Sequence, residues 1–438
     1  MDPATFDVVI VGGRPAGASL AARLGAAGLR VLIVERATFP SAPAVSAPFL
    51  LPHALALVDE VGVDEAAYTV DTPQLRSFVL ELAGYFRSVL AFDAGVAGRS
   101  YFYTVDRAQL DHALWRSLAA WPSVTAWSDA HVEDLLRDEG GRVVGVTGRR
   151  GGDRLEARAR AVIGADGRFS LVARKVDARV TEERSDVATT LYYDLWDGVA
   201  DYEPGGPPIA HIHSSCDGFS FVFMPTSRGR TIVLAQGRAD AYEALAGAPD
   251  AIYEGLLRAR PRLWRRLHGA RRSGELAGMK RVGNLFREPG GPGWALCGDA
   301  YHQKDSIDAQ GIYDALLGAK ELAAQVVRWH RGELTWEAAV AAYGASIYAA
   351  CKPMFDATMR RLAREIYSVP PPAAAKTLMR WMLTNPAYGR RFAALVTRQL
   401  DPAAFLTPPL ALSLVAGGAL QRLRRRLRGG DPTDALPV

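Results

Sequence analysis

Residues 8–17, VVIVGGRPAG, join a run of Val and Ile to a glycine-punctuated turn, and the small-residue segment 18–27 follows directly. A buried strand that enters such a turn and then a helix is typical of the first βαβ unit of a dinucleotide-binding fold. The next strand, 29–34, ends at Glu35, where a carboxylate would accept a hydrogen bond from the 2′-hydroxyl of an adenosine ribose. The remaining candidate cofactor-binding residues of this unit are Gly12, Gly13, Arg14, Pro15, Ala16, Gly17 and Arg36.

Arg14 departs from this pattern because it occupies the second glycine position. That position normally lacks a side chain, so that the backbone can approach a pyrophosphate. The Arg14 side chain is therefore expected either to point away from the phosphates or to curl back and add its positive charge to them. Packing of a strand against a helix is the alternative explanation for a glycine-rich turn taken alone.

Composition places the chain among globular proteins. With 438 residues, 49% of them hydrophobic and 23% charged, the chain can bury one large core or two moderate ones. Its three cysteines, Cys216, Cys297 and Cys351, are widely spaced, which favours neither a disulfide framework nor a zinc site. The first strand begins within the first ten residues, so no secretory signal is expected and a cytoplasmic location is predicted.

The net charge of +5 arises from basic residues spread along the chain, so nucleic-acid binding is not predicted. Residues 420–428, LQRLRRRLR, form the one basic run. Most such runs are solvated helix ends, and a weak contact with anionic lipid is the alternative. Pro408 and Pro409 interrupt the apolar stretch 405–420, which therefore predicts a packed helix and not a membrane span.

The order of the predicted elements divides the chain into three parts. Residues 1–72, 101–177 and 277–330 predict an α/β nucleotide-binding domain with a Rossmann-like sheet. Residues 73–100 and 178–276 carry strand patterns rich in Phe, Tyr and Trp, which predict an inserted antiparallel β-sheet substrate domain. Residues 331–438 predict a helical C-terminal region. A cleft between the first two parts is the expected place for a small-molecule site.

Two further strand-to-turn junctions lie along the chain. Residues 162–170, VIGADGRFS, contain Asp166 and Gly167, and residues 295–311, ALCGDAYHQKDSIDAQG, contain Gly298 and Asp299. Together with the glycine turn and the segment RAQLD at 107–111, they occur in an order that packing does not explain. On these motifs, over about residues 5–330, the sequence resembles the FAD-dependent monooxygenases of the para-hydroxybenzoate hydroxylase type, which are related to the flavin halogenases and geranylgeranyl reductases.

The resemblance implies FAD as the cofactor, held noncovalently. It implies that the glycine turn binds the pyrophosphate, that Arg107 lies beside the pyrophosphate or ribityl chain, and that Val132 contacts the adenine. It also implies that Asp166 belongs to the cofactor site and that Asp299 binds a ribityl hydroxyl. The backbone of Ala309, Gln310 and Gly311 would approach the isoalloxazine, with the positive end of the following helix directed at the flavin.

The loop at 302–308 departs from the family pattern. Ser306 stands where the family often has a proline, so this loop is expected to be less rigid. His302 and Lys304 lie in the same loop and are expected either to line the reacting face or to lie on the surface. Neither is assigned as a catalytic base, and the sequence assigns no catalytic residue.

The resemblance implies an enzyme that uses O₂ and electrons from NAD(P)H to hydroxylate or otherwise oxygenate an apolar or aromatic small molecule, as in natural-product tailoring. Tyr193, Phe221 and Phe223 are candidates for a substrate-facing wall, and core packing is their alternative role. Halogenation is disfavoured because no lysine precedes Lys175 and the strand 218–225 lacks the family's tryptophans. Reduction of prenyl-type alkenes and a non-catalytic flavin-holding role stay open as alternatives.

Overall fold

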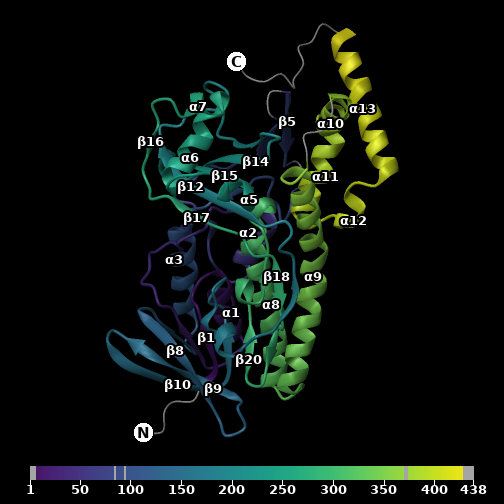
Figure 1. Ribbon diagram of the computed structural model, residues 1–438. Coiled ribbons are helices and arrows are strands. Elements are labelled where there is room, and N and C mark those ends of the chain that lie inside the picture. Colours follow the sequence, from purple (N-terminus) through teal and green to yellow (C-terminus); the bar gives the residue numbers. More distant parts are fainter. Residues whose placement is uncertain (1–5, 83–84, 93–94, 369–372, 428–438) are drawn as a thin grey trace.

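The computed structural model describes residues 6–427 except 83–84, 93–94 and 369–372 (Figure 1). Its first sheet is built on a parallel core in the order β20, β10, β1, β2, β7. The Val and Ile residues of β1 are buried, as is typical of a central strand in a parallel sheet. The parallel strands are β1 (Phe6–Val11), β2 (Val31–Val34), β7 (Val124–Trp127), β10 (Asp153–Gly164) and β20 (Trp294–Leu296).

Helices α1 and α8 pack on each other beside the first sheet, and the hairpin of β8 and β9 extends it. The first half of β10 pairs antiparallel with β9, and its second half enters the parallel sheet beside β1. The elements of this domain are α1 (Pro15–Ala26), β3 (Phe49–Leu50), α2 (Pro52–Asp59), β6 (Tyr103–Thr104), α3 (Arg107–Ser117), β8 (Ala130–Arg137), β9 (Val143–Arg150), α4 (Leu171–Lys175), β19 (Gly290–Gly291) and α8 (Gly311–His330).

The second sheet has the order β16, β12, β15, β14, β13, β4, β5, and β17 also pairs with β12. Its neighbours are antiparallel except β4 and β13, which run parallel and come from two separate segments of the chain. The strands are β4 (Ser77–Leu82), β5 (Phe86–Ala91), β12 (Thr189–Asp197), β13 (Ala210–Ser214), β14 (Phe219–Pro225), β15 (Thr231–Arg238), β16 (Arg271–Arg272) and β17 (Ala277–Met279).

The structure moves both ends of the predicted insertion 178–276. Strand β11 (Val180–Glu183) lies outside the second sheet and pairs with β18 (Leu285–Arg287), which pairs in turn with β21 (His302–Gln303). Strand β17, which begins at residue 277, belongs to the second sheet. A strand pattern in the sequence gives no information on the distant strand with which it pairs, so these two boundaries depended on the tertiary structure.

The two faces of the second sheet bury different cores. One face carries Leu191 and Tyr193 and packs with Phe49, Leu51 and the C-terminal helices. The other face packs under α5 (Ala239–Glu243), α6 (Pro249–Arg258) and α7 (Pro261–Arg266), and α6 and α7 lie at one end of the molecule in Figure 1. The first face is therefore the one that looks toward the nucleotide-binding domain.

The C-terminal region is helical. Helix α9 packs along α8, and α11 packs on β5 (Figure 1). In the described part of the chain, no helix combines the length and apolar character needed to cross a membrane. The helices are α9 (Trp336–Glu365), α10 (Ala373–Leu383), α11 (Pro386–Val396), α12 (Pro402–Phe405) and α13 (Pro408–Leu427).

Candidate functional site

The glycine turn after β1 has space for glycine alone. A Cβ atom built on Gly17 would lie 1.8 Å from the carbonyl oxygen of Gly12, and one on Gly12 would lie 2.4 Å from that of Ala165. Gly12 also has a φ of +103°, which favours glycine. The turn therefore lies directly against the strand end that precedes Asp166. Helix α1 begins here with no side-chain cap, which leaves first-turn N–H groups available to an anion.

Glu35 is buried at the end of β2, where two backbone groups hold its carboxylate. The Gly13 amide donates to Oε2 at 2.7 Å, and the Ala37 amide donates to Oε1 at 3.0 Å. Each oxygen keeps a second lone pair that can accept a ribose hydroxyl. Strand β8 begins beside Glu35, because the Ala130 amide donates to the Glu35 carbonyl at 3.0 Å, and Val132 follows on that strand. Arg36, in contrast, is exposed to solvent.

Arg14 and Arg107 share one fully buried carboxylate, that of Asp111. Arg107 donates to Asp111 from Nε at 3.0 Å and from a terminal nitrogen at 2.9 Å, and it also donates to Ser46 Oγ at 2.7 Å. Of the two conformations expected for Arg14, the structure shows the one in which its side chain turns aside to pair with an acid. Asp111 belongs to the RAQLD segment at 107–111. Its pairing with Arg14 depends on the contact between α3 and the start of α1.

Asp166 differs from its predicted role. Its carboxylate accepts hydrogen bonds from Ser170 Oγ and from the backbone amides of Leu171 and Val172, at 2.7 and 3.2 Å for the two amides. These bonds cap the N-terminus of α4, because a short acidic side chain there satisfies otherwise unpaired N–H groups. The assignment of the Asp166 side chain to the cofactor is thus replaced by a capping role, and the DG motif contributes to the site through its neighbour.

That neighbour is Arg168, which the sequence analysis did not single out. Its guanidinium donates to the carbonyls of Gly283 and Lys304 at 3.1 and 3.2 Å and lies 3.4 Å from Asp299 Oδ2. Arg168 therefore joins the second motif to the third. The signal in the sequence was a cation directly after the Asp–Gly pair.

The GD motif packs against the start of α1. Gly298 has a φ of +63°, and a Cβ atom built on it would lie 2.9 Å from the Cβ of Ala16. The Asp299 side chain that follows is 35% exposed, and its ion pair with Arg168 is long. Asp299 therefore retains acceptor capacity for a hydroxyl group.

The loop before α8 presents its backbone and turns its side chains away. Ala309 has a left-handed φ of +53°. The Gln310 amide group is fully buried, where it donates to the Val396 carbonyl at 2.8 Å and accepts from Arg398 Nε at 2.8 Å. Helix α8 has no side-chain cap, and Gly311 is exposed, so the positive end of this helix is free for a ligand.

Two buried aspartates, Asp305 and Asp308, anchor this loop, which was expected to be less rigid without the proline. Asp305 accepts hydrogen bonds from Gln236 Nε2 at 2.7 Å and from the Ile307 amide at 2.9 Å. Asp308 pairs with Arg361 at 2.6 Å and accepts from Thr358 Oγ1 at 2.7 Å. These polar contacts tie the loop to β15 and α9. Burial raises the pKa of Asp305 above its ordinary value.

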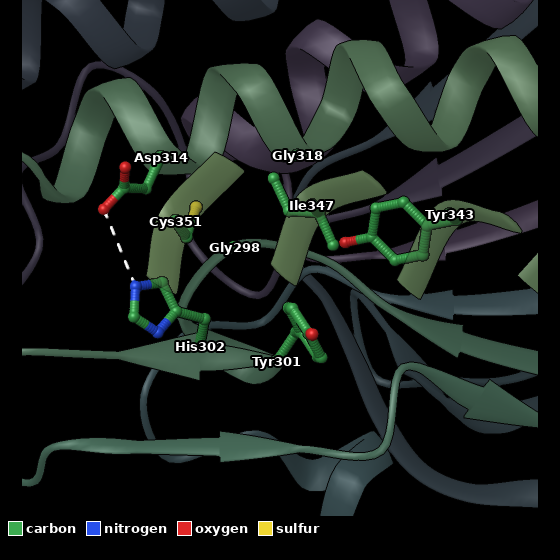
Figure 2. Close-up of a pocket in the computed structure, with 8 residues that line it drawn as sticks. All are labelled: Gly298, Tyr301, His302, Asp314, Gly318, Tyr343, Ile347 and Cys351. Carbon is green, nitrogen blue, oxygen red and sulfur yellow. Dashed lines mark ion pairs between the residues drawn. The ribbon is translucent and has the colours of Figure 1, made fainter. Parts of the chain in front are cut away.

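His302 and Lys304 are both buried, which excludes the surface position that was one of their two expected locations. Lys304 pairs with Asp314, and the His302 ring stacks on Phe286 with the ring centres 4.1 Å apart. Burial lowers the pKa of His302. Figure 2 shows the small cavity beside them, between the GD turn and helices α8 and α9. Its volume, about 10 Å³, is on the order of what one water molecule requires, so it is far too small for a flavin.

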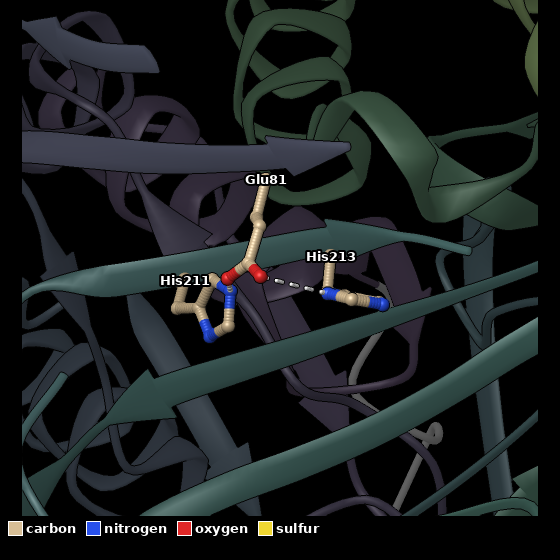
Figure 3. A group of neighbouring side chains, drawn as sticks. All are labelled: Glu81, His211 and His213. Carbon is tan, nitrogen blue, oxygen red and sulfur yellow. Dashed lines mark ion pairs between the residues drawn. The ribbon is translucent and has the colours of Figure 1, made fainter. Parts of the chain in front are cut away.

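Glu81, on β4, forms a buried cluster with His211 and His213 of β13 that has the residue types of a metal site (Figure 3). Glu81 Oε2 lies 2.9 Å from His211 Nε2. However, Arg262 donates to Glu81 Oε1 at 2.9 Å, and Arg266 lies 3.0 Å from His211 Nδ1, which must accept. The two guanidinium groups of α7 already supply positive charge to this cluster. Burial lowers the pKa of His211 to about 4, so the ring is neutral.

The predicted aromatic wall is split between the two faces of the second sheet. Tyr193 lies on the face toward the nucleotide-binding domain, where its hydroxyl accepts a hydrogen bond from the Ser46 amide at 2.6 Å. Phe221 and Phe223 are fully buried on the opposite face, under α6 and α7. This position corrects their assignment to a substrate-facing wall, because residues of the outer core cannot face the flavin loop.

The residues at this site fit FAD. Two uncapped helix N-termini, at α1 and α8, offer N–H donors to a pyrophosphate and to an electron-rich flavin edge. Glu35 and Asp299 offer acceptors to sugar and ribityl hydroxyls, and the glycine turn permits close approach of the backbone. The site is thus assembled from three sequence motifs that the fold brings together.

Comparison with known proteins agrees with this chemistry. A family model described as an FAD binding domain matches residues 5–273. A 6-methylpretetramide 4-monooxygenase from Streptomyces rimosus is 35% identical over 175 residues, which are 40% of this chain and 41% of that protein. A digeranylgeranylglycerophospholipid reductase from Methanocella arvoryzae is 26% identical over 325 residues, 72% of this chain and 76% of that protein.

Among solved structures, a flavin-dependent brominase, Bmp2, superposes with a TM-score of 0.77 over 97% of this chain and all of that one, at 20% identity. At this identity the likeness shows a common fold. The family match covers more than half of the chain and includes the glycine turn, Arg107 and the DG motif. The chain belongs to the FAD-binding-domain family of flavoprotein monooxygenases and their relatives, and it is an FAD-dependent enzyme.

Proposed function

We propose that the protein is a NAD(P)H-dependent monooxygenase that oxygenates an apolar or aromatic small molecule. The observation that carries this proposal is the position of Ala309. This residue of the loop before α8 packs against the apolar cluster of the second sheet that includes Tyr193 and Leu191. An apolar molecule in this place would lie between the flavin loop and a wall that excludes water, as oxygen transfer requires.

The proposed cofactor contacts follow from the geometry above. The glycine turn and α1 would hold the pyrophosphate, Glu35 the adenosine ribose, and Asp299 the ribityl chain. When bound, FAD would supply the two electrons of NAD(P)H to O₂, so that one oxygen atom would enter the substrate and the other would leave as water. The backbone of residues 309–311 would orient the flavin, and the N-terminus of α8 would stabilise negative charge on its reduced ring.

The same apolar wall favours one alternative, reduction of alkenes in prenyl-type chains. The observation behind it is the match to the archaeal lipid reductase, which extends over more of this chain than the match to the monooxygenase. Halogenation has less support, because the sequence contains no lysine before Lys175 and Lys304 is buried against Asp314.

The experiment reduces the purified FAD-loaded protein anaerobically with NADH or NADPH and then mixes it with ¹⁸O₂ and a panel of phenolic, polyketide and prenyl compounds. Monooxygenation predicts a product that carries one ¹⁸O atom, formed with consumption of reduced nicotinamide. A saturated product formed without O₂ would overturn the proposal in favour of alkene reduction. Bromide added to a parallel reaction is expected to leave the product unchanged.

A further inference from the structure

Helix α13 (Pro408–Leu427) carries a stripe of apolar residues on its solvent-exposed side. Leu412, Ala416, Leu420, Leu423 and Leu427 recur every three or four residues, which places them along one face of the helix. The four leucines are 72%, 47%, 54% and 78% exposed, in chain order. In a water-soluble setting, an apolar row of this kind usually faces a partner.

The opposite face of α13 accounts for its attachment to the rest of the chain. Leu414 and Gly418 are buried there, and a Cβ atom built on Gly418 would lie 1.8 Å from the Trp381 carbonyl oxygen of α10. Asn385 also donates to the Leu414 carbonyl at 3.0 Å. Figure 1 shows α13 at the outer edge of the molecule beside α10. The leucine stripe therefore lies on the side of α13 that faces away from α10.

The C-terminal segment that contains the stripe is strongly basic. Residues 373–427 contain nine lysines and arginines and a single acid, Asp401. By helical spacing, Arg424 and Arg426 lie on either side of the stripe near its C-terminal end, and both are exposed. A narrow row of leucines bordered by cations matches the boundary between lipid headgroups and acyl chains.

We propose that α13 docks on the surface of an anionic phospholipid bilayer, with the leucine stripe at the acyl boundary and the arginines among the phosphates. The helix would lie in the plane of the membrane surface. This proposal is independent of the reaction that the flavin site performs, because α13 contributes no residue to that site. Docking would bring the enzyme close to apolar molecules dissolved in the bilayer.

The test measures flotation of the full FAD-loaded protein with vesicles of phosphatidylcholine that do or do not contain phosphatidylglycerol. We expect binding to the anionic vesicles that weakens as salt rises. Arg424→Gln together with Arg426→Gln should weaken vesicle binding about thirtyfold. Each surface cation contributes roughly 1 kcal/mol, and about 1.4 kcal/mol corresponds to a tenfold change in affinity. Leu420→Ser, Leu423→Ser and Leu427→Ser together should weaken it by roughly tenfold or more.

Matched controls remove the same number of cations or of apolar side chains elsewhere. Arg149→Gln with Arg154→Gln removes two exposed cations from the β9–β10 hairpin, and Val70→Ser, Val89→Ser and Leu245→Ser remove three exposed apolar residues. All variants should keep FAD content and melting temperature. Failure of the wild type to float, or equal losses in controls and α13 variants, would overturn the proposal. A dimer that the leucine variants dissociate, without vesicle binding, would overturn it in favour of a second copy of this chain.

Discussion

The glycine turn and the second sheet approach the same cofactor site by different means. At the turn, the backbone makes the site: Gly12 and Gly17 leave no room for a side chain, and α1 offers N–H groups. In the second sheet, side chains form the wall near the cofactor site, and successive residues of a strand point to opposite faces of the sheet. Tyr193 faces the flavin loop, whereas Phe221 and Phe223 fill a core on the far side.

This comparison separates residues that bind from residues that support. A site that is formed by the backbone tolerates few substitutions, and it can be recognised in the sequence by its glycines. A side-chain-built wall can be recognised only when the face of each residue is known. The predictions below test the two regions in turn, beginning with the change that should have the largest effect.

Gly17→Ala should abolish FAD binding. Its new Cβ atom would lie 1.8 Å from the Gly12 carbonyl oxygen, so the turn and α1 must move apart. The measurement is the flavin-to-protein ratio of the purified variant. Gly255→Ala in α6 is the control, because nothing lies within 4 Å of its Cβ position. A Gly17→Ala protein that retains full FAD would contradict the backbone-built description of the turn.

Phe221→Ala should destabilise the protein by about 3–5 kcal/mol, because a fully buried aromatic side chain is lost from the outer core. Thermal unfolding of the FAD-loaded variant measures this effect. The fraction of reduced nicotinamide that ends as peroxide should stay at the wild-type level in the folded variant. An increase in peroxide without loss of stability would show that Phe221 faces the substrate. Phe169→Ala, which removes an exposed ring, is the control for stability.

Asp299→Ala should weaken FAD binding at least about tenfold, since a carboxylate hydrogen bond to a ribityl hydroxyl contributes roughly 1.5–3 kcal/mol. Titration of the apoprotein with FAD, followed by flavin fluorescence, gives the dissociation constant. Asp299→Asn keeps an acceptor oxygen and should lose less affinity. Because FAD is expected to be noncovalent, acid denaturation should release it intact from both variants. Unchanged affinity in Asp299→Ala would show that the GD motif does not contact the cofactor.

The outer face of the second sheet should make stability dependent on pH. The pKa of His211 is about 4 in the folded protein, against 6.5 for an ordinary histidine. Between these values the unfolded chain binds more protons, so stability falls as pH falls from 6.5 towards 4. At pH 5 the loss from this residue is about 2 kcal/mol.

Denaturant unfolding of wild type and His211→Gln at several pH values measures this term. The slope of the unfolding free energy against pH gives the number of protons taken up on unfolding. Between about pH 4.5 and 6.5 this number should be smaller in the variant by about one. Identical slopes in the two proteins would show that the pKa of His211 is not lowered in the fold. The difference between the proteins isolates His211 from other buried histidines, His53 and His302, whose pKa values are also lowered.

Tyr193→Phe should have the smallest effect on stability, about 1 kcal/mol, because it removes a single hydrogen bond from the Ser46 amide. Its functional effect should be larger than that of Phe221→Ala, since Tyr193 lies on the face that meets the flavin loop. We expect more peroxide per NAD(P)H consumed in the presence of the substrate. A fully coupled Tyr193→Phe enzyme would place the substrate away from this part of the sheet.

Local features of the sequence predicted the start of the cofactor domain. The buried strand, the glycine turn and the acid at the end of the second strand are local features, and steric exclusion at Gly12 and Gly17 fixes their arrangement. The DG and GD motifs carry the family resemblance, and that resemblance implied FAD as the cofactor.

Tertiary structure decided which polar and aromatic side chains meet. Asp111 between Arg14 and Arg107, Arg168 beside Asp299, and Asp305 and Asp308 under the flavin loop each depend on contacts between distant segments. The split of Tyr193 from Phe221 depends on the register of the strands, since a shift of one residue exchanges the two faces of a sheet. Local sequence specifies backbone conformation at short range, whereas the partner of a buried charge or ring is set by the packing of the whole chain.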